Sequence, residues 1–153
     1  MGTTVMGRVV VKARIENLGD LLKVRDGLLK AEKVRAIEVE DALVDTGATM
    51  LSMPKSLIKK LGLKKFTSRR MRTAKGSAMT HIYDAVWLTI LGRNCTIDVS
   101  EVAEGCPVLI GQVPLELLDF VVDPKRQKLI GNPEHGGEFM YDAFSTCFLS
   151  RQG

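Results

Sequence analysis

The sequence predicts a mainly β protein that contains one or two short helices. Apolar residues recur in short runs, and some of these alternate with polar residues, as they do from Val9 to Ile15. Alternation with a period of two is typical of a half-buried strand, because successive side chains point to opposite faces. Turn-forming residues separate the runs, and two segments begin with a proline and continue with helical spacing. These observations favour several short strands around one core.

The N-terminal part of the chain is predicted to begin with a strand at Gly7 to Ile15, followed by a turn at Asn17 to Asp20. Residues 21–33 are ambiguous. Their leucines could share one face of a short helix, but the pair Asp26-Gly27 is a strong hairpin signal. We interpret this segment as a hairpin or excursion of unknown role.

The rest of the chain is predicted to alternate between strands and two short helices. Pro54 to Leu61 and Leu115 to Asp119 are expected to be helical, because Pro54 and Pro114 suit a helix start and Gly62 can end the first helix. A hairpin is expected with Gly76 near its tip. The predicted strands are 34–44, 50–53, 69–74, 78–90, 95–102, 108–110, 120–122, 128–130 and a terminal strand at 139–149.

Length and composition indicate one ordinary globular domain. The chain has 153 residues, of which 45% are hydrophobic and 26% are charged. A chain of this length and composition can bury a hydrophobic core without the support of disulfides or metal ions. No apolar run approaches the roughly 18 residues of a membrane span, and the N-terminus lacks a signal pattern, so a cytoplasmic location is expected. Three cysteines without close spacing are interpreted as buried, reduced thiols: Cys95, Cys106 and Cys147.

The charge of the chain is unevenly distributed. The net charge is +4, yet residues 59–75 contain eight basic residues and no acidic one, so the remainder carries −4. This basic run is either a solvated surface or a surface that attracts acidic peptides or nucleic acid. Phe66 is its one aromatic residue, which argues against recognition of stacked bases.

One short segment has the features expected of a carboxylate used in catalysis. Residues 43–49 read Leu-Val-Asp-Thr-Gly-Ala-Thr, so an apolar run delivers Asp45 to a tight turn. Asp and Gly are common in turns, but here the glycine-tipped hairpin and an apolar strand that ends at Gly111 follow in order. The motif occurs once in the chain.

Other patterns of chemical interest are weaker. His135 and Glu138 are three residues apart, but two glycines separate them and no second pair exists, so we interpret this segment as a polar loop and predict no metal site. His81 has no accompanying nucleophile-elbow pattern. Three methionines are interpreted as core residues: Met50, Met53 and Met71.

Taken together, the motifs resemble those of the retroviral-type, or retropepsin-like, aspartic proteases. The matching pieces are residues 43–49, the flap-like residues 73–77 (Thr-Ala-Lys-Gly-Ser) and residues 108–111 (Val-Leu-Ile-Gly), and the chain looks like the single-domain members found in bacteria. The resemblance implies a closed, barrel-like, all-β fold. It also implies a single domain over residues 1–153, with a core at about 9–130 and a C-terminal extension of uncertain role at 131–153.

The resemblance further implies an aspartic endopeptidase that acts as a homodimer, because members with one Asp-Thr-Gly per chain take one aspartate from each subunit. Two such carboxylates would share a proton, since both cannot easily be ionised at short distance. The ionised carboxylate would act as a general base on a water molecule, and the protonated one would polarise the scissile carbonyl. The expected partners are a peptide or protein substrate and a second copy of the chain; no membrane, nucleic acid or cofactor is expected.

The resemblance assigns expected roles to individual residues. Asp45 would be the catalytic residue, Thr46 would hydrogen-bond across the dimer, and Gly47 would support the loop through its backbone N–H. The expected substrate-binding residues lie in the loop, at the hairpin tip and in the strand behind the loop: Ala48, Thr49, Ala74, Lys75, Gly76, Ser77, Leu109, Ile110 and Gly111.

The sequence also departs from the family pattern. Thr49 and Gln112 stand where retroviral members usually have an Asp and an Arg that form an ion pair, so both charges are absent together and neither is left unpaired. An alternative function is a non-catalytic retropepsin-like module for dimerisation or peptide binding, because a fold alone does not confer activity. The intact Asp45-Thr46-Gly47 sequence favours the enzyme.

Overall fold

The computed structural model of the chain describes residues 8–149. Residues 1–7 and 150–153 lie outside this range. The excluded residues include Gly7, where the first strand was expected to begin, and the N-terminal residues on which the expected localisation depends. Within the described range, no helix has the length and apolar character needed to cross a membrane.

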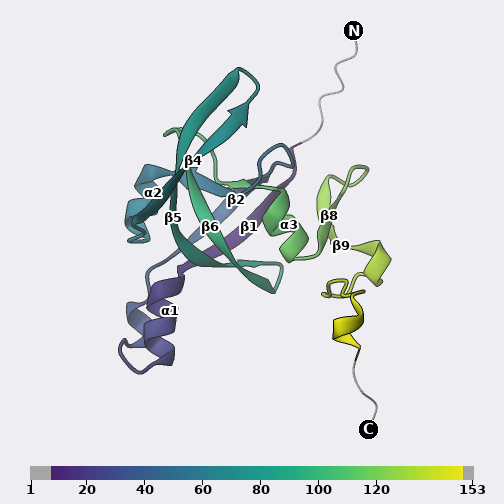
Figure 1. Cartoon of the computed structure of the whole chain (residues 1–153), viewed down its shortest axis with the longest axis horizontal. Coiled ribbons are helices and arrows are strands. Elements are labelled where there is room, and N and C mark those ends of the chain that lie inside the picture. Colours follow the sequence, from purple (N-terminus) through teal and green to yellow (C-terminus); the bar gives the residue numbers. More distant parts are fainter. Residues whose placement is uncertain (1–7, 150–153) are drawn as a thin grey trace.

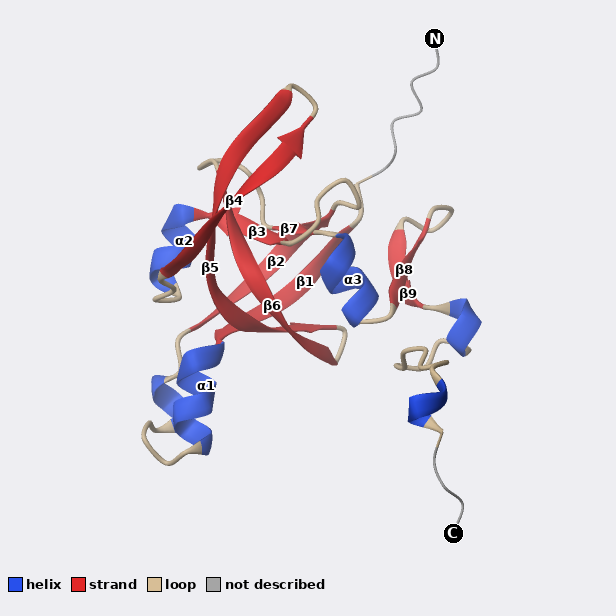
Figure 2. Ribbon diagram, viewed as in Figure 1, coloured by secondary structure: helices blue, strands red, loops and turns tan. Residues whose placement is uncertain are grey.

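Most strands within residues 8–149 belong to one seven-stranded sheet with the order β1-β2-β7-β3-β6-β5-β4 (Figure 1; Figure 2). An additional pairing of β1 with β5 closes six of these strands into a barrel and leaves β4 outside it. The predicted fold class is therefore confirmed. The strands are β1 (Val10–Asn17), β2 (Ala36–Val44), β3 (Leu51–Pro54), β4 (Lys65–Thr73), β5 (Gly76–Ile90), β6 (Arg93–Val102) and β7 (Leu109–Ile110).

The short strand β7 lies between β2 and β3, parallel to β2 and antiparallel to β3. Residues 45–50 connect β2 to β3, so β7 lies between the two strands that flank this loop. Ile110 pairs with Val44 at the end of β2 and with Leu51 at the start of β3. Because Ile110 is completely buried, both ends of the loop are attached to one residue of the core.

Alternating residues of the barrel strands form the core. On β5, the side chains of Val86, Leu88 and Ile90 are completely buried, and on β1 those of Ala13 and Ile15 are too. Full burial of a valine, leucine or isoleucine side chain contributes about 1.5–3 kcal/mol to the stability of the folded state. The alternation seen in the sequence is therefore the alternation between the inside and the outside of the barrel.

Strands β4 and β5 form a hairpin that stands out from the barrel (Figure 1). All nine residues of β4 are exposed, whereas β5 is exposed near the tip and alternates into the core from Ile82 onward. The predicted hairpin is confirmed, and Gly76 lies next to its tip with a φ of +129°. Near the base of the hairpin, the pairing of β4 with β5 shifts in register between Lys65 and Thr67, and the pairing of β5 with β6 shifts between Tyr83 and Val86.

Helix α1 (Leu18–Arg25) replaces the hairpin or excursion that we predicted for residues 21–33 and the turn predicted before it. The Asn17 side chain caps the helix by accepting a hydrogen bond from the backbone N–H of Asp20 (2.9 Å). Gly27 has a φ of +76° and donates its N–H to Val24, while the next N–H reaches back to Lys23. Asp26-Gly27 therefore ends a helix in a Schellman-type arrangement.

An ion pair between the buried Asp20 and the half-exposed Arg35 connects α1 to the residue that precedes β2. The carboxylate of Asp20 accepts hydrogen bonds from Nε and Nη2 of Arg35, both at 2.8 Å, and from the Arg35 backbone N–H at 3.0 Å. These hydrogen bonds outweigh burial and lower the pKa of Asp20 below its ordinary value. The pair keeps α1 against the barrel although the helix itself buries little apolar surface.

The remaining elements agree with the prediction in type more than in position. Pro54 ends β3 and occupies the position just before α2 (Lys55–Lys60), and α3 (Gln112–Leu117) begins two residues before Pro114. No strand forms at 139–149, which instead contains one short 3-10 turn, so the prediction of a terminal strand is wrong. The other elements are η1 (Ala31–Lys33), β8 (Phe120–Asp123), β9 (Lys128–Gly131), η2 (Pro133–His135) and η3 (Thr146–Phe148).

Strands β8 and β9 form a separate hairpin, and the chain after β9 is attached to it through Asp119 and His135. His135 lies with Nδ1 at 2.7 Å from Oδ2 of Asp119 and Nε2 at 2.8 Å from Oδ1 of Asp142. Hydrogen bonds to Asp119 and then to Asp142 raise the pKa of His135. Burial would raise the pKa of Asp119, but its hydrogen bonds to His135, Met140 and Asn132 together lower it.

Replacement of His135 is expected to destabilise the protein most at mildly acidic to neutral pH. The folded-state pKa of His135 is raised, so its stabilising contribution is complete below the unfolded value of about 6.5 and is lost as pH rises through the folded value. His135→Gln should therefore lower Tm more at about pH 6 than at about pH 9. Thermal unfolding of both proteins at the two pH values measures this difference, and an equal loss of Tm at both would show that the charge of His135 contributes nothing.

The three cysteines are free thiols, but they differ in burial. Cys95 is buried, and burial raises the pKa of its thiol to about 11. Cys106 and Cys147 are exposed, so the expectation that all three are buried is wrong for these two. Cys106 lies in the loop between β6 and β7 and Cys147 lies in η3, so both are outside the strands that supply the core.

Candidate active site

The loop after β2 holds Asp45 through backbone contacts on two sides. The N–H of Asp45 donates to the carbonyl of Ile110 on β7 (3.0 Å), and the carbonyl of Asp45 accepts the N–H of Ala48 (3.0 Å). The carboxylate oxygen Oδ1 accepts the N–H of Gly47 at 2.9 Å. Asp45 is half-buried, while Thr46 and Gly47 are exposed. The turn therefore fixes one carboxylate oxygen and leaves the loop open to solvent.

Two glycines allow the loop to adopt this shape. A Cβ at Gly47 would lie 3.1 Å from Oδ1 of Asp45, so a side chain there would press on the carboxylate. A Cβ at Gly111 would lie 2.5 Å from the carbonyl oxygen of Met50 and 2.7 Å from that of Ala48. Only glycine therefore lets β7 pass directly beneath the loop.

Three backbone hydrogen bonds attach the loop to the residues that follow β7. The N–H groups of Gly111, Gln112 and Val113 donate to the carbonyls of Met50 (3.0 Å), Ala48 (2.8 Å) and Thr49 (2.9 Å), respectively. The first turn of α3 thus carries the second half of the loop. Ile110 and Gly111, two of the predicted substrate-binding residues, lie behind the loop and support it.

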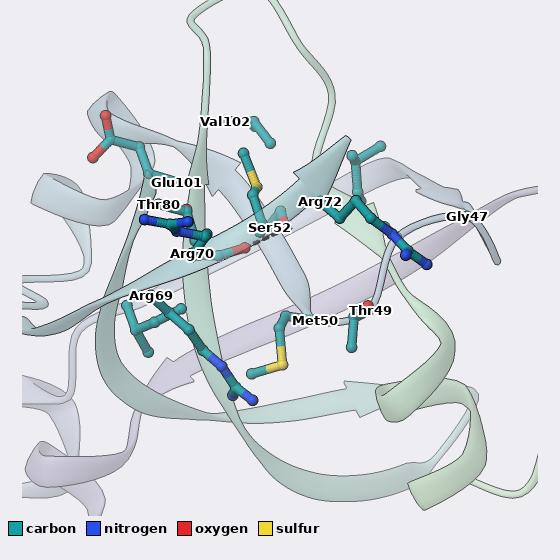
Figure 3. Close-up of a pocket in the computed structure, with 15 residues that line it drawn as sticks. Gly47, Thr49, Met50, Ser52, Arg69, Arg70, Arg72, Thr80, Glu101 and Val102 are labelled. Carbon is teal, nitrogen blue, oxygen red and sulfur yellow. Dashed lines mark hydrogen bonds between the residues drawn. The ribbon is translucent and has the colours of Figure 1, made fainter. Parts of the chain in front are cut away.

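A cavity of about 580 Å³ lies between this loop and the β4–β5 hairpin (Figure 3). Its volume falls within the range of about 300–1,000 Å³ that is usual for ligand sites. The loop, the barrel and the hairpin each contribute to its wall. Its lining residues are Gly47, Ala48, Thr49, Met50, Ser52, Arg69, Arg70, Met71, Arg72, Thr80, Ile82, Ser100, Glu101, Val102 and Leu109.

The cavity brings together part of the residue set predicted from the sequence. Gly47, Ala48, Thr49 and Leu109 line it, whereas Asp45 and Thr46 are adjacent in the loop but do not. The hairpin-tip residues lie farther along the hairpin and are also absent from the lining: Ala74, Lys75, Gly76 and Ser77. The role of each of these residues stays a prediction.

The sequence analysis did not predict the residues of the barrel strands that line the cavity. Ser52 and Ser100 are nearly buried neighbours on β3 and β6, and their hydroxyl oxygens are 2.6 Å apart. Glu101 accepts a hydrogen bond from the Tyr83 hydroxyl at 2.6 Å. This bond, followed by burial, raises the pKa of Tyr83 to about 12. No local motif marks these residues, because only the pairing of distant strands brings them to the cavity.

The methionines and histidines noted in the sequence differ in their surroundings. Met53 is completely buried, as predicted, but Met71 is 41% exposed and lines the cavity, so its interpretation as a core residue is wrong. Met50 packs against the core and also reaches the cavity. His81 lies on the hairpin, 3.2 Å from the Ser68 hydroxyl, and His135 belongs to the C-terminal cluster described above.

The positions that carry the ion pair in retroviral members are occupied differently here. The side chain of Gln112 donates to Oε1 of Glu116 within α3 at 3.0 Å. Thr49 is joined to this helix by its backbone carbonyl, which accepts the N–H of Val113. Backbone hydrogen bonds thus connect the loop to α3 in the absence of both charges.

A closed β barrel, an Asp-Thr-Gly loop braced by an inserted strand and a hairpin that borders the adjacent cavity define a retropepsin-like domain. A family model described as "Aspartyl protease" matches residues 32–131, a range that contains both the loop and the hairpin. The chain belongs to this aspartyl protease family, and membership supports a proteolytic function. No curated protein matches the chain.

Proposed function

We propose that the protein is an aspartic endopeptidase in which Asp45 is the catalytic residue and two copies of the chain form the active unit. The observation that carries the proposal is the Asp45 loop itself. One carboxylate oxygen is held by the N–H of Gly47, and both ends of the loop pair with the buried residue Ile110. A rigidly held carboxylate next to a cavity is the arrangement that acid–base chemistry requires.

A homodimer supplies the second carboxylate that this chemistry needs. The motif occurs once per chain, and Thr46 and Gly47 are exposed at the surface of a single chain. In a two-fold symmetric dimer, a residue that lies close to the symmetry axis also lies close to its own copy in the other subunit. Two Asp45 carboxylates would then lie close enough to share one proton.

The proposed reaction is hydrolysis of a peptide bond by a water molecule held between the two carboxylates. The ionised Asp45 takes a proton from the water, whose oxygen attacks the scissile carbonyl carbon. The protonated Asp45 donates a hydrogen bond to the carbonyl oxygen. As the carbon–nitrogen bond breaks, the leaving nitrogen receives the proton that the first carboxylate took from the water. The pair is then singly protonated again.

Titration with a statine-type inhibitor is expected to abolish peptide cleavage at one inhibitor per two chains. Such an inhibitor imitates the tetrahedral intermediate and would occupy both carboxylates at once. Purified protein is incubated with a diverse peptide pool, cleavage is followed by mass spectrometry, and sedimentation gives the mass of the active species. Cleavage by a monomer, or complete inhibition only at one inhibitor per chain, would contradict the dimer.

The same experiment tests the catalytic class. Peptide cleavage that the statine-type inhibitor does not affect would contradict an aspartic mechanism. Absence of all cleavage, together with binding of peptides from the pool, would favour the alternative of a non-catalytic peptide-binding module. The cleavage rate of the proposed enzyme should be highest on the acid side of neutral, because one carboxylate of the pair must keep its proton.

A further inference from the structure

The wall of the cavity that belongs to β4 is strongly basic. Arg69, Arg70 and Arg72 all line it, and Glu101 is its one acidic lining residue. Glu101 is engaged by the Tyr83 hydroxyl. The basic run noted in the sequence therefore borders the candidate active site, where its positive charge can attract a negatively charged ligand.

Arg69, Arg70 and Arg72 have no acidic partner among residues 8–149. Four arginines elsewhere each form an ion pair within the chain: Arg14, Arg25, Arg35 and Arg126. Every residue of β4 is exposed, so the three guanidinium groups are available to a ligand. A guanidinium offers a planar set of donors that matches a carboxylate.

The register of the hairpin distinguishes Arg69 from its neighbours. Arg69 pairs directly with Thr80, and Thr67 pairs with Ile82. Directly opposed residues of an antiparallel pair lie on the same face of the sheet, so Arg69 shares the face of Thr80 and Ile82, which also line the cavity. Arg70 and Arg72 pair with Met79 and Ser77 and belong to the other face of the strand, but they too border the cavity. In Figure 3 the Arg72 side chain extends toward the Gly47 end of the site.

We propose that the cavity selects acidic peptide segments, with Arg69 binding a carboxylate of the substrate directly and Arg70 and Arg72 attracting further acidic side chains beside the scissile bond. This inference rests on the proposed function, because it names the substrate class of the same site. Peptide is favoured over nucleic acid because Phe66 is the single aromatic residue of the basic run and does not line the cavity.

Peptides that differ only in charge test the proposal. One cleaved sequence is synthesised with Glu, Gln or Lys at the positions flanking the scissile bond. The expected order of kcat/KM is Glu, then Gln, then Lys, with about a tenfold advantage of Glu over Gln at low salt that shrinks as salt is added. Equal kcat/KM for the Glu and Gln peptides would overturn the proposal and leave the proteolytic function intact.

Variants assign the effect to the arginines. Arg69→Gln is expected to remove most of the Glu-over-Gln ratio, and the triple variant Arg69→Gln, Arg70→Gln, Arg72→Gln is expected to remove it entirely. Arg25→Gln is the matched control, because Arg25 is an exposed arginine on α1, and α1 lies at the opposite end of the barrel from the projecting arm of the hairpin (Figure 1). A ratio that survives in the triple variant would overturn the assignment to these residues.

A binding measurement separates this inference from catalysis. The catalytically disabled Asp45→Asn variant should bind the labelled Glu peptide more tightly than the Gln peptide by fluorescence anisotropy, whether or not any peptide is cleaved by the unmodified protein. Equal binding of both peptides would overturn the inference. Tighter binding of a single-stranded oligonucleotide than of the Glu peptide, lost in the triple arginine variant, would assign the basic surface to nucleic acid and also overturn it.

Discussion

Asp45→Asn should abolish peptide cleavage, with kcat lower by roughly 10² to 10⁴-fold, and leave the fold intact. The substituted amide cannot act as a general base or share a proton with its partner. Its oxygen can still accept the Gly47 N–H that Oδ1 of Asp45 accepts at 2.9 Å, so the turn is preserved. Cleavage of one pool-derived peptide measures the loss, and thermal unfolding checks that Tm is unchanged.

Asp41→Asn is the matched control for this variant. Asp41 is an exposed residue of the same strand, β2, and the substitution removes the same charge four residues earlier. It should cleave the peptide at the rate of the unmodified protein. Turnover by Asp45→Asn similar to that of the unmodified protein would refute the assignment of the catalytic residue.

Mixing the two proteins extends the test to the dimer. If chains exchange freely, an equal mixture of unmodified and Asp45→Asn protein contains about a quarter of intact dimers, because the chains pair at random. Residual activity of about a quarter is therefore expected. Residual activity of about half would mean that each chain acts alone.

Gly111→Ala is expected to cost about 3 kcal/mol of unfolding free energy, toward the upper end of what overpacking usually costs. The added Cβ would lie 2.5 Å from the Met50 carbonyl oxygen, 2.6 Å from the Thr49 carbonyl carbon and 2.7 Å from the Ala48 carbonyl oxygen. These are backbone atoms of the Asp45 loop, which cannot move aside as a flexible side chain can. Urea unfolding measures the stability, and a peptide assay under folding conditions measures the accompanying loss of activity.

Gly105→Ala separates this steric effect from the general cost of replacing a glycine. Gly105 has a φ of +91° and open space around its Cβ position, so alanine there meets only backbone strain, of about 1–2 kcal/mol. Gly111 has a φ of −84°, which alanine adopts without strain. A smaller loss for Gly111→Ala than for Gly105→Ala would show that the loop can shift away from β7 at little cost.

Local sequence patterns predicted most of the strands because each pattern reports one element. Alternation in β5 and β6 and the glycine at the hairpin tip are local signals, and the structure confirms them. The pair Asp26-Gly27 misled the prediction because this pattern is compatible with two different elements. The same two residues suit a tight hairpin and the end of a helix, and the choice depends on Asn17, which caps α1 nine residues earlier.

Features that depend on distant parts of the chain could not be read from the sequence. The pairing of β1 with β5 closes the barrel, and the pairing of β3 with β6 brings Ser52 and Ser100 together. A terminal strand was predicted at 139–149, but Tyr141 and Phe144 are 81% and 90% exposed and pair with no described strand. Apolar composition alone did not specify a partner for this segment.

Two register shifts lie near the base of the β4–β5 hairpin, one in the pairing of β4 with β5 and one in the pairing of β5 with β6, and they have a mechanical consequence. A bulge interrupts the ladder of hydrogen bonds and is a natural place for a strand to bend. Both interruptions lie where the exposed arm of the hairpin meets the buried part of β5. Flexing at this hinge would swing the arginine-bearing arm as a unit, so a peptide could be admitted and released without disturbing the packed interior of the barrel.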